Sequence, residues 1–229
     1  GNAELDLFHA GVEGDPFYAE NIYDYRKYEF CRFVYERTFE LAEIAGGKPV
    51  LVFEGLNTYA DVYVNGIKVG CAGNMLVAQS FDVSRAVKVG TNEIRVVIFS
   101  AANLAREKDY PVSVSSGGED SDEYTRQRKP PHSFGWDIMP RFPSAGMWRS
   151  VRIEIEKPTR IAQTYYATLR ADEKRAEIVY KYRFITDAET LDGFQVRVTV
   201  GDTAITKNAF FVSGEGTIEL ENPRLWWPW

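Results

Sequence analysis

Hydrophobic and polar residues alternate with a period of two along most of the chain, which is the pattern of half-buried β-strands. Over the first 157 residues this pattern predicts strands at 29–39, 49–55, 79–83, 93–100 and 148–156. The second of these, PVLVFEG, has few polar positions and predicts a more deeply buried strand. No segment keeps a 3.6-residue period long enough for a major helix, although short helical turns are expected near 5–10 and 101–108. The pattern therefore indicates an all-β protein.

The clearest local signal is a hairpin at 58–70, TYADVYVNGIKVG. Two alternating arms flank Asn65-Gly66, and these two residue types tolerate the positive φ angles that a type I′ turn requires. The sequence therefore predicts two antiparallel strands joined by a two-residue turn.

The strand pattern stops at Lys157-Pro158 and restarts after it, which predicts a domain boundary because proline ends strand pairing. Five short strands then follow at a spacing of about ten residues, the pattern of a β-sandwich. Sandwiches of the immunoglobulin type have about seven strands, so we expect a domain at 1–157 and a second one at 158–229 that is incomplete at its C-terminus. Trp226 and Trp227 at its end are expected to pack in a core or a domain interface.

Composition and charge exclude several classes of protein. The formal net charge is −6 and the pI about 5.2, which does not fit a surface that binds nucleic acid. No apolar run approaches the roughly 20 residues needed to span a membrane. Cys31 and Cys71 are expected to be unbonded, and with His9 and His132 they lack the spacing of a metal site. We therefore expect no cofactor and no metal, and we place the protein in the cytoplasm, with secretion or a periplasmic location as alternatives.

Two loops stand out. The polar, Gly- and Ser-rich segment 110–124 predicts a long loop that is either functional or a plain surface excursion. The segment 128–154, RKPPHSFGWDIMPRFPSAGMWRSVRIE, concentrates tryptophans, prolines and glycines between a basic pair and a strand. The prolines restrict the backbone of this loop, while the glycines allow turns that other residues do not adopt.

Several separated motifs together resemble glycoside hydrolase family 2, and β-mannosidases in particular. FGWD, followed by Pro140-Arg141 and then GMWR, resembles the end of the family's N-terminal sugar-binding domain. The resemblance extends in order over almost the whole chain, through GNAELDLFHAGVEGDPFYAEN, FEGLNTYADVYVNGIKVG, GNM with FDV, and LWWP. It implies a galactose-binding-like jelly-roll β-sandwich followed by a truncated immunoglobulin-like β-sandwich.

The same resemblance implies a function. Family members are retaining exo-glycosidases whose two catalytic carboxylates, about 5–5.5 Å apart, lie on a (β/α)₈ barrel that follows the two β domains. No alternating strand-helix region of that size occurs here, so we expect no catalytic residue in this chain and no hydrolysis by it alone. The expected partners are the barrel of a parent chain and a glycoside or oligosaccharide with a terminal β-linked sugar.

The resemblance also assigns the residues of the segment 128–154. Asp137 is expected to bind hydroxyls of the terminal sugar, with Trp136 as an apolar wall and Gly135 allowing close backbone passage. Arg128 and Arg141 are expected to orient the loop, His132 to form hydrogen bonds within it, and Trp148 to pack in the core. The alternative, drawn from the residues alone, is a core plug in which Asp137 pairs with Arg141.

One difference from the family leaves the substrate open. Ile138 and Met139 replace the Trp-Gly of the usual FGWDWGPR, so β-galactosides, β-glucuronides and β-glucosaminides stand beside β-mannosides. A second function class also remains, a stand-alone carbohydrate-binding module with exposed aromatic residues on one face.

Overall fold

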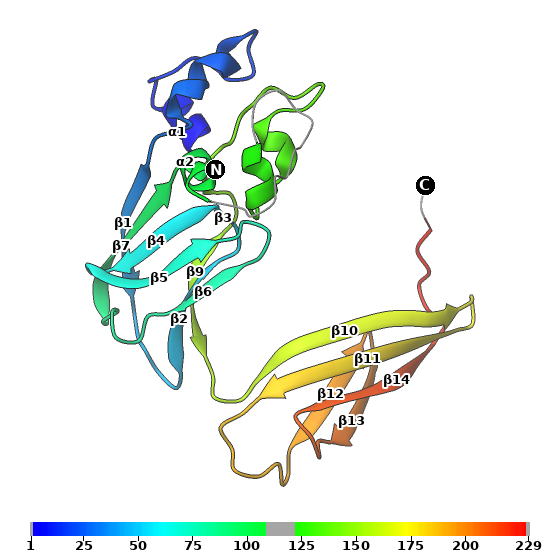
Figure 1. Ribbon diagram of the computed structural model, residues 1–229. Helices are drawn as coiled ribbons and strands as arrows, with labels where there is room; N and C mark the ends of the chain where they lie inside the picture. Colours follow the sequence, from blue (N-terminus) through cyan, green and yellow to red (C-terminus); the bar gives the residue numbers. More distant parts are fainter. Residues whose placement is uncertain (1, 109–121, 228–229) are drawn as a thin grey trace. The chain divides into compact units, whose positions relative to one another are not determined.

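A computed structural model describes residues 2–108 and 122–227 (Figure 1). The chain forms two compact units, Gly1–Ile155 and Glu156–Trp229, and each is described by itself. The division falls two residues before the predicted boundary at Lys157-Pro158. Strands dominate both units, which confirms the predicted all-β fold.

The first unit is built on antiparallel strands in two larger sheets and one small one. The four-stranded sheet has the order β1-β7-β4-β5, formed by β1 (Phe33–Leu41), β7 (Gly90–Phe99), β4 (Tyr59–Val64) and β5 (Ile67–Gly73). The three-stranded sheet has the order β6-β2-β9, formed by β6 (Gln79–Asp82), β2 (Lys48–Phe53) and β9 (Val151–Glu156). The short strands β3 (Leu56–Asn57) and β8 (Gly146–Met147) pair with each other.

The core of this unit follows from the period-two pattern. Along β4 burial alternates strictly, so that Ala60, Val62 and Val64 point into the core. Strand β2 is buried from Pro49 to Phe53, as its nearly continuous apolar sequence predicts. The rings of Phe53 and Phe81 meet edge to face at 6.0 Å. Apolar burial of this kind is the main term that holds the unit together.

The hairpin predicted at 58–70 is confirmed as β4 and β5. Asn65 and Gly66 have φ angles of 49° and 78°, as a type I′ turn requires. The Asn65 side chain also donates to Ala86 O and to Asn92 Oδ1, both at 2.8 Å, and accepts from Glu93 N at 2.9 Å. The turn residue thus ties the hairpin to the neighbouring strand β7.

Replacing Asn65 by alanine is expected to lower the free energy of unfolding by about 2 kcal/mol, because a left-handed alanine is strained and hydrogen-bonding groups lose their partner. Asn65→Gly separates the two causes, since glycine tolerates the φ angle but restores no hydrogen bond. Urea titration gives the comparison. Equal stability of the alanine variant and the unchanged protein would contradict the prediction.

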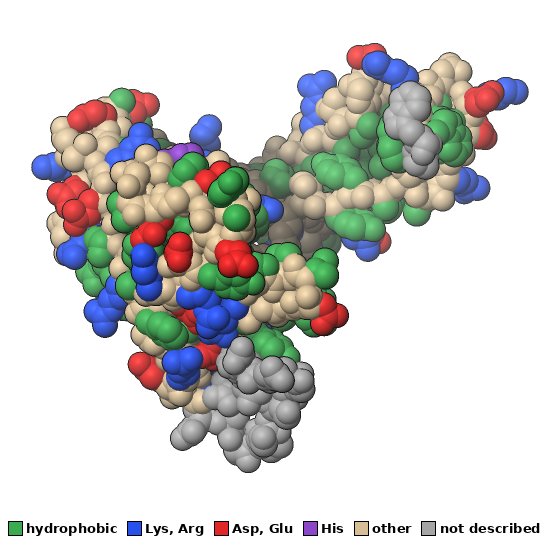
Figure 2. Space-filling model, turned by 90° about the horizontal axis from the view of Figure 1, so that it is seen from above, with side chains coloured by type: hydrophobic (Ala, Val, Ile, Leu, Met, Phe, Trp, Pro, Cys, Tyr) green, Lys and Arg blue, Asp and Glu red, His purple; other side chains and the backbone are tan. Residues whose placement is uncertain are grey.

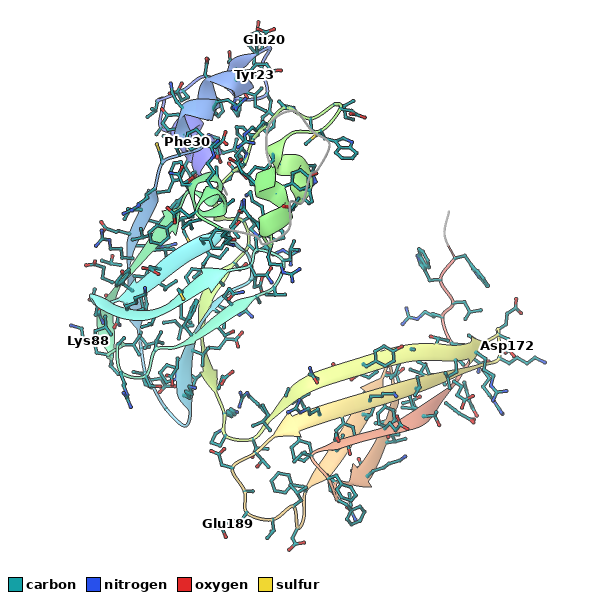
Figure 3. All side chains as sticks on the ribbon, in the orientation of Figure 1. Glu20, Tyr23, Phe30, Lys88, Asp172 and Glu189 are labelled. Carbon is teal, nitrogen blue, oxygen red and sulfur yellow. The ribbon has the colours of Figure 1, made fainter. Side chains whose placement is uncertain are left out.

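Helical turns lie at one end of the first unit, the end at which Figure 3 labels Glu20, Tyr23 and Phe30. The turns expected near 5–10 and 101–108 are confirmed as α1 (Ala3–His9) and α2 (Ala101–Arg106). The 3₁₀ helices are η1 (Asn21–Tyr28), η2 (Asp122–Arg126) and η3 (Pro131–Phe134). Most of the long loop predicted at 110–124 lies outside the described residues; its last three residues belong to η2.

Two predicted strand starts are wrong. The strand expected from Glu29 begins only at Phe33, because Glu29 ends the 3₁₀ helix η1 with its N–H bonded to Arg26 O at 3.2 Å. The strand expected from Trp148 begins at Val151 as β9. In both places aromatic residues beside a strand imitate the pattern of the strand itself.

The second unit contains five strands within the described residues, and all five positions were predicted. A three-stranded sheet has the order β10-β11-β14, formed by β10 (Arg160–Ala171), β11 (Arg175–Ile185) and β14 (Ser213–Glu221). A second sheet pairs β12 (Gln195–Val200) with β13 (Thr203–Asn208). Between the sheets the rings of Phe184 and Phe194 stack at 6.0 Å.

Hydrophobic side chains also gather on the surface of the second unit (Figure 2). Trp226 and Trp227 are 78% and 74% exposed, so core packing, one of the two alternatives expected for them, is wrong. They follow β14 in a segment that belongs to no helix or strand.

Candidate functional site: a projecting hairpin on a charged base

The loop between η3 and β8 contains a hairpin with a two-residue turn. Trp136 and Met139 each donate a backbone hydrogen bond to the other's carbonyl at 3.0 Å, which leaves Asp137 and Ile138 at the tip. All four side chains are exposed, and that of Trp136 is 69% exposed. The loop leaves the same end of the first unit as the N-terminal segment that carries α1 and η1 (Figure 1). The structure thus places Asp137 at a projecting tip and Trp136 in the residue pair that closes the hairpin.

The arms of the hairpin are ordered by short local contacts. Gly135, with a φ of 111°, turns the chain out of η3 in a conformation that favours glycine. Behind it, Ser133 Oγ donates to Pro130 O at 2.5 Å, and Phe142 N donates to Ser133 O at 2.9 Å. The ring of Phe142 meets Tyr25 of η1 edge to face at 5.8 Å. The loop is therefore held both by itself and by the N-terminal segment.

A buried cluster of charges lies directly behind the hairpin. The Arg141 guanidinium is paired with the carboxylates of Glu29 and Glu123, and all three side chains are buried. Arg106 of α2 adds a second cation, with Nε at 2.5 Å from Glu123 Oε1. Burial lowers the pKa of Arg141, but hydrogen bonds to the two carboxylates outweigh it and the net pKa shift is upward. Arg141 therefore faces the protein interior, rather than pairing with Asp137 as the core-plug alternative has it.

Lys129 closes the base of the loop. Its buried ammonium donates to Asn57 Oδ1 and to Ser144 O, both at 2.6 Å, and so joins the beginning of the loop to its end. Burial lowers the pKa of Lys129 to about 7. The nearby Glu4 of α1 is also buried, which raises its pKa to about 7. Each of these ionisable groups is therefore costly to keep charged inside the protein.

Arg128 supports the loop through its backbone. It pairs with Asn74 in a parallel bridge, and Arg128 O accepts from Met75 N at 3.0 Å. This bond fixes the loop at 74–78 against the base of the longer one. The side chain of Arg128 itself is exposed.

Trp148 does not occupy the core position expected for it. It follows β8, is 40% exposed, and lays its ring over Gly55, where an added Cβ would meet Nε1 at 2.5 Å. The guanidinium of Arg149 lies 4.1 Å from the centre of the ring. Trp148 also lines a surface hollow together with Glu54 and Leu76. The Trp148 ring thus packs on the surface against Gly55, in space that a side chain at position 55 would occupy.

Sequence reasoning did not single out Glu29, Glu123 or Glu4, and it gave Lys129 only as half of a basic pair on a solvated rim, which is wrong because Lys129 is 3% exposed. Glu29 was assigned to a strand, and the other three stand in polar segments where a charged side chain normally meets water. The one local signal is that Lys129 precedes two prolines at the start of a constrained loop.

The described residues hold no group of three or more His, Cys, Asp or Glu side chains arranged to bind a metal ion. Cys31 and Cys71 are unbonded and exposed. Among the helices in the described ranges, none is both long and apolar enough to cross a membrane. Over the face of the first unit that Figure 2 presents, acidic and basic side chains are intermingled.

Comparison with known proteins gives consistent relatives. The chain is 27% identical to β-mannosidase B of Thermothelomyces thermophilus over 241 residues, which cover 99% of this chain and 27% of that protein. It is 34% identical to the β-mannosidase of Bos taurus over 65% of this chain and 18% of the relative. The chain thus spans about a quarter or less of the length of these curated relatives.

A solved structure agrees over the full chain. The β-D-mannosidase of Dictyoglomus thermophilum matches with a TM-score of 0.82 and 27% identity, covering 100% of this chain and 29% of that one. Residues 1–149, which include the whole hairpin and its charged base, match the family described as glycosyl hydrolase 2 galactose-binding domain-like. The chain therefore belongs to the galactose-binding domain-like family of glycosyl hydrolase 2 proteins.

Proposed function

We propose that this chain is the non-catalytic N-terminal part of a larger retaining exo-β-glycosidase, and that it supplies one wall of the pocket for the terminal sugar. The observation that carries the proposal is the similarity to a β-mannosidase along 99% of this chain. The matched region makes up only 27% of that β-mannosidase. The two catalytic carboxylates then belong to a further domain of the parent protein. A β-mannoside is the first candidate substrate.

The projecting hairpin suits the role of a pocket wall. A carboxylate at its tip accepts hydrogen bonds from two neighbouring sugar hydroxyls, and bonds to a charged acceptor are roughly twice as strong as neutral ones. Asp137 is exposed there, with the Trp136 ring next to it in sequence as an apolar surface. The tip is tied down before any ligand arrives, so little conformational entropy is lost on binding.

The residues at the tip also bear on the choice of sugar. Ile138 is 88% exposed and Met139 is 45% exposed, so both side chains are available for contact. Aliphatic groups there offer less stacking surface than a tryptophan does. A β-galactoside, β-glucuronide or β-glucosaminide is therefore the alternative substrate that the assay must include.

The test uses the parent protein, expressed from the open reading frame with its downstream region and assayed on a panel of p-nitrophenyl β-glycosides. We expect cleavage of the β-mannoside, and a loss of kcat/KM of at least about 10-fold, or 1.4 kcal/mol, in Asp137→Ala. Asp187→Ala, which changes an exposed aspartate in the second unit, is the matched control and is expected to keep full activity.

Cleavage of another β-glycoside with the same dependence on Asp137 would keep the pocket wall and change the sugar. Activity that is indifferent to Asp137, or a parent protein without glycosidase activity, would overturn the proposal.

A further inference from the structure

The charge cluster behind the hairpin joins four segments that are far apart in the sequence. Glu29 ends η1, Arg106 ends α2, Glu123 belongs to η2 and Arg141 follows the hairpin. Glu29 and Arg141 are separated by 112 residues, and Arg141 Nε donates to Glu29 Oε1 at 2.8 Å. No single element therefore sets the position of Arg141.

Arg141 is also the buried group that stands next to the tip. Only Pro140 separates it from Met139, the last residue of the hairpin. Before the hairpin, the centre of the ring of Phe134, the last residue of η3, lies 5.3 Å from the guanidinium carbon. Arg141 is thus tied to the chain on both sides of the hairpin.

Two carboxylates fix the position of the Arg141 guanidinium more closely than a single carboxylate would. A guanidinium is a rigid planar fork with five donors, so binding two fixed carboxylates sets its orientation as well as its distance. Glu29 and Glu123 are 8% and 5% exposed, so water competes little for these bonds. The cost of burying the charges is tolerated because each is paired.

We propose that Glu29 and Glu123 are positioning residues, which act through Arg141 to set where the tip at Asp137 stands relative to the sheets. The use of that position for binding a sugar rests on the function proposed above. The positioning itself is a property of this chain and is measured without any substrate.

The experiment measures the distance from the tip to the sheet by pulsed electron spin resonance. Spin labels are placed at Ile138→Cys and at Glu93→Cys on β7, both exposed positions, in a chain with Cys31→Ser and Cys71→Ser. We expect a narrow distance distribution, which Glu29→Gln shifts or broadens by more than about 2 Å. Glu29→Asp keeps the charge and is expected to restore part of the narrow distribution.

Two controls separate positioning from stability. Glu36→Gln neutralises an exposed carboxylate paired with Arg95 at 3.2 Å and is expected to change nothing. A second label pair, Ser80→Cys on β6 with Glu93→Cys, spans the two sheets and is expected to keep its distance in Glu29→Gln.

The proposal is overturned if the tip distance is unchanged in both Glu29→Gln and Glu123→Gln. It is also overturned if the distance between the sheets changes together with the tip distance, because the cluster then only holds the fold. In the active parent protein Glu29→Gln is expected to lower kcat/KM by about 10-fold or more. A moved tip without that loss would count against the proposed pocket wall, while the positioning role would stand.

Discussion

Replacing Arg141 by methionine is expected to lower the free energy of unfolding of the first unit by about 3–5 kcal/mol. The change removes the buried cation that Glu29 and Glu123 share, and leaves these buried carboxylates only the more exposed Arg26, 3.5 Å from Glu29, and Arg106, 2.5 Å from Glu123. Methionine has a similar length, so the loss reflects unpaired charge more than lost volume. Urea unfolding followed by circular dichroism measures the effect.

The matched control is Arg152→Met. Arg152 is also paired with two carboxylates, those of Glu54 and Glu154, but its side chain is 43% exposed. Water replaces the lost partner there, so we expect a much smaller change in the free energy of unfolding than for Arg141→Met. Removing both buried acids as well, in Arg141→Met with Glu29→Gln and Glu123→Gln, is expected to recover part of the stability. Equal effects of Arg141→Met and Arg152→Met would show that burial does not strengthen the cluster.

The stability of the first unit is expected to fall as the pH rises from about 4.5 to above 7, because of Glu4. Burial raises the pKa of this carboxyl from 4.5 to about 7 in the folded protein. The folded state therefore binds a proton more tightly than the unfolded state, and this stabilising contribution is complete below pH 4.5. It is lost as the pH rises through 7, and amounts to about 3 kcal/mol at 1.36 kcal/mol for each pKa unit.

Glu4→Gln removes this dependence. We expect the variant to be more stable than the unchanged protein at pH 8, by up to about 3 kcal/mol, and similar to it near pH 4.5. Lys129 contributes with the opposite slope at higher pH, because its pKa falls from 10.5 to about 7 in the folded protein. Between these two values the unfolded state holds a proton that the folded state has lost, so stability rises with pH. Urea titrations at a series of pH values test both the contribution of Glu4 and that of Lys129.

A suitable control is Glu93→Gln, which changes an exposed carboxylate on β7. The free energy of unfolding of this variant is expected to differ between pH 5 and pH 8 by as much as that of the unchanged protein. The prediction fails if Glu4→Gln keeps that difference too.

Local sequence was enough wherever an element depends on its own residues. The turn at Asn65-Gly66 follows from the backbone preferences of two adjacent residues, and the alternation from Tyr59 to Val64 follows from the geometry of a strand. The same holds for the five strands of the second unit. Local reasoning failed beside strands, where aromatic residues at Phe30 and Trp148 imitate a strand without joining one.

The motifs of the segment 128–154 predicted a constrained loop that carries Asp137 and Trp136, but not the two-residue hairpin in which the loop presents them. They did not reveal what holds the hairpin in place. Glu29 lies 112 residues from Arg141 and Asn57 lies 72 residues from Lys129, so neither pairing leaves a pattern within one element.

The sequence by itself thus determined the all-β fold, the hairpin at 58–70 and the position of the constrained loop, because strands and turns depend on short-range periodicity and backbone preference. Only the tertiary structure decided which charges are buried together behind that tip, and that Trp148 rests on Gly55 outside the core. The physical reason is that desolvation and close packing depend on segments brought together from distant parts of the chain.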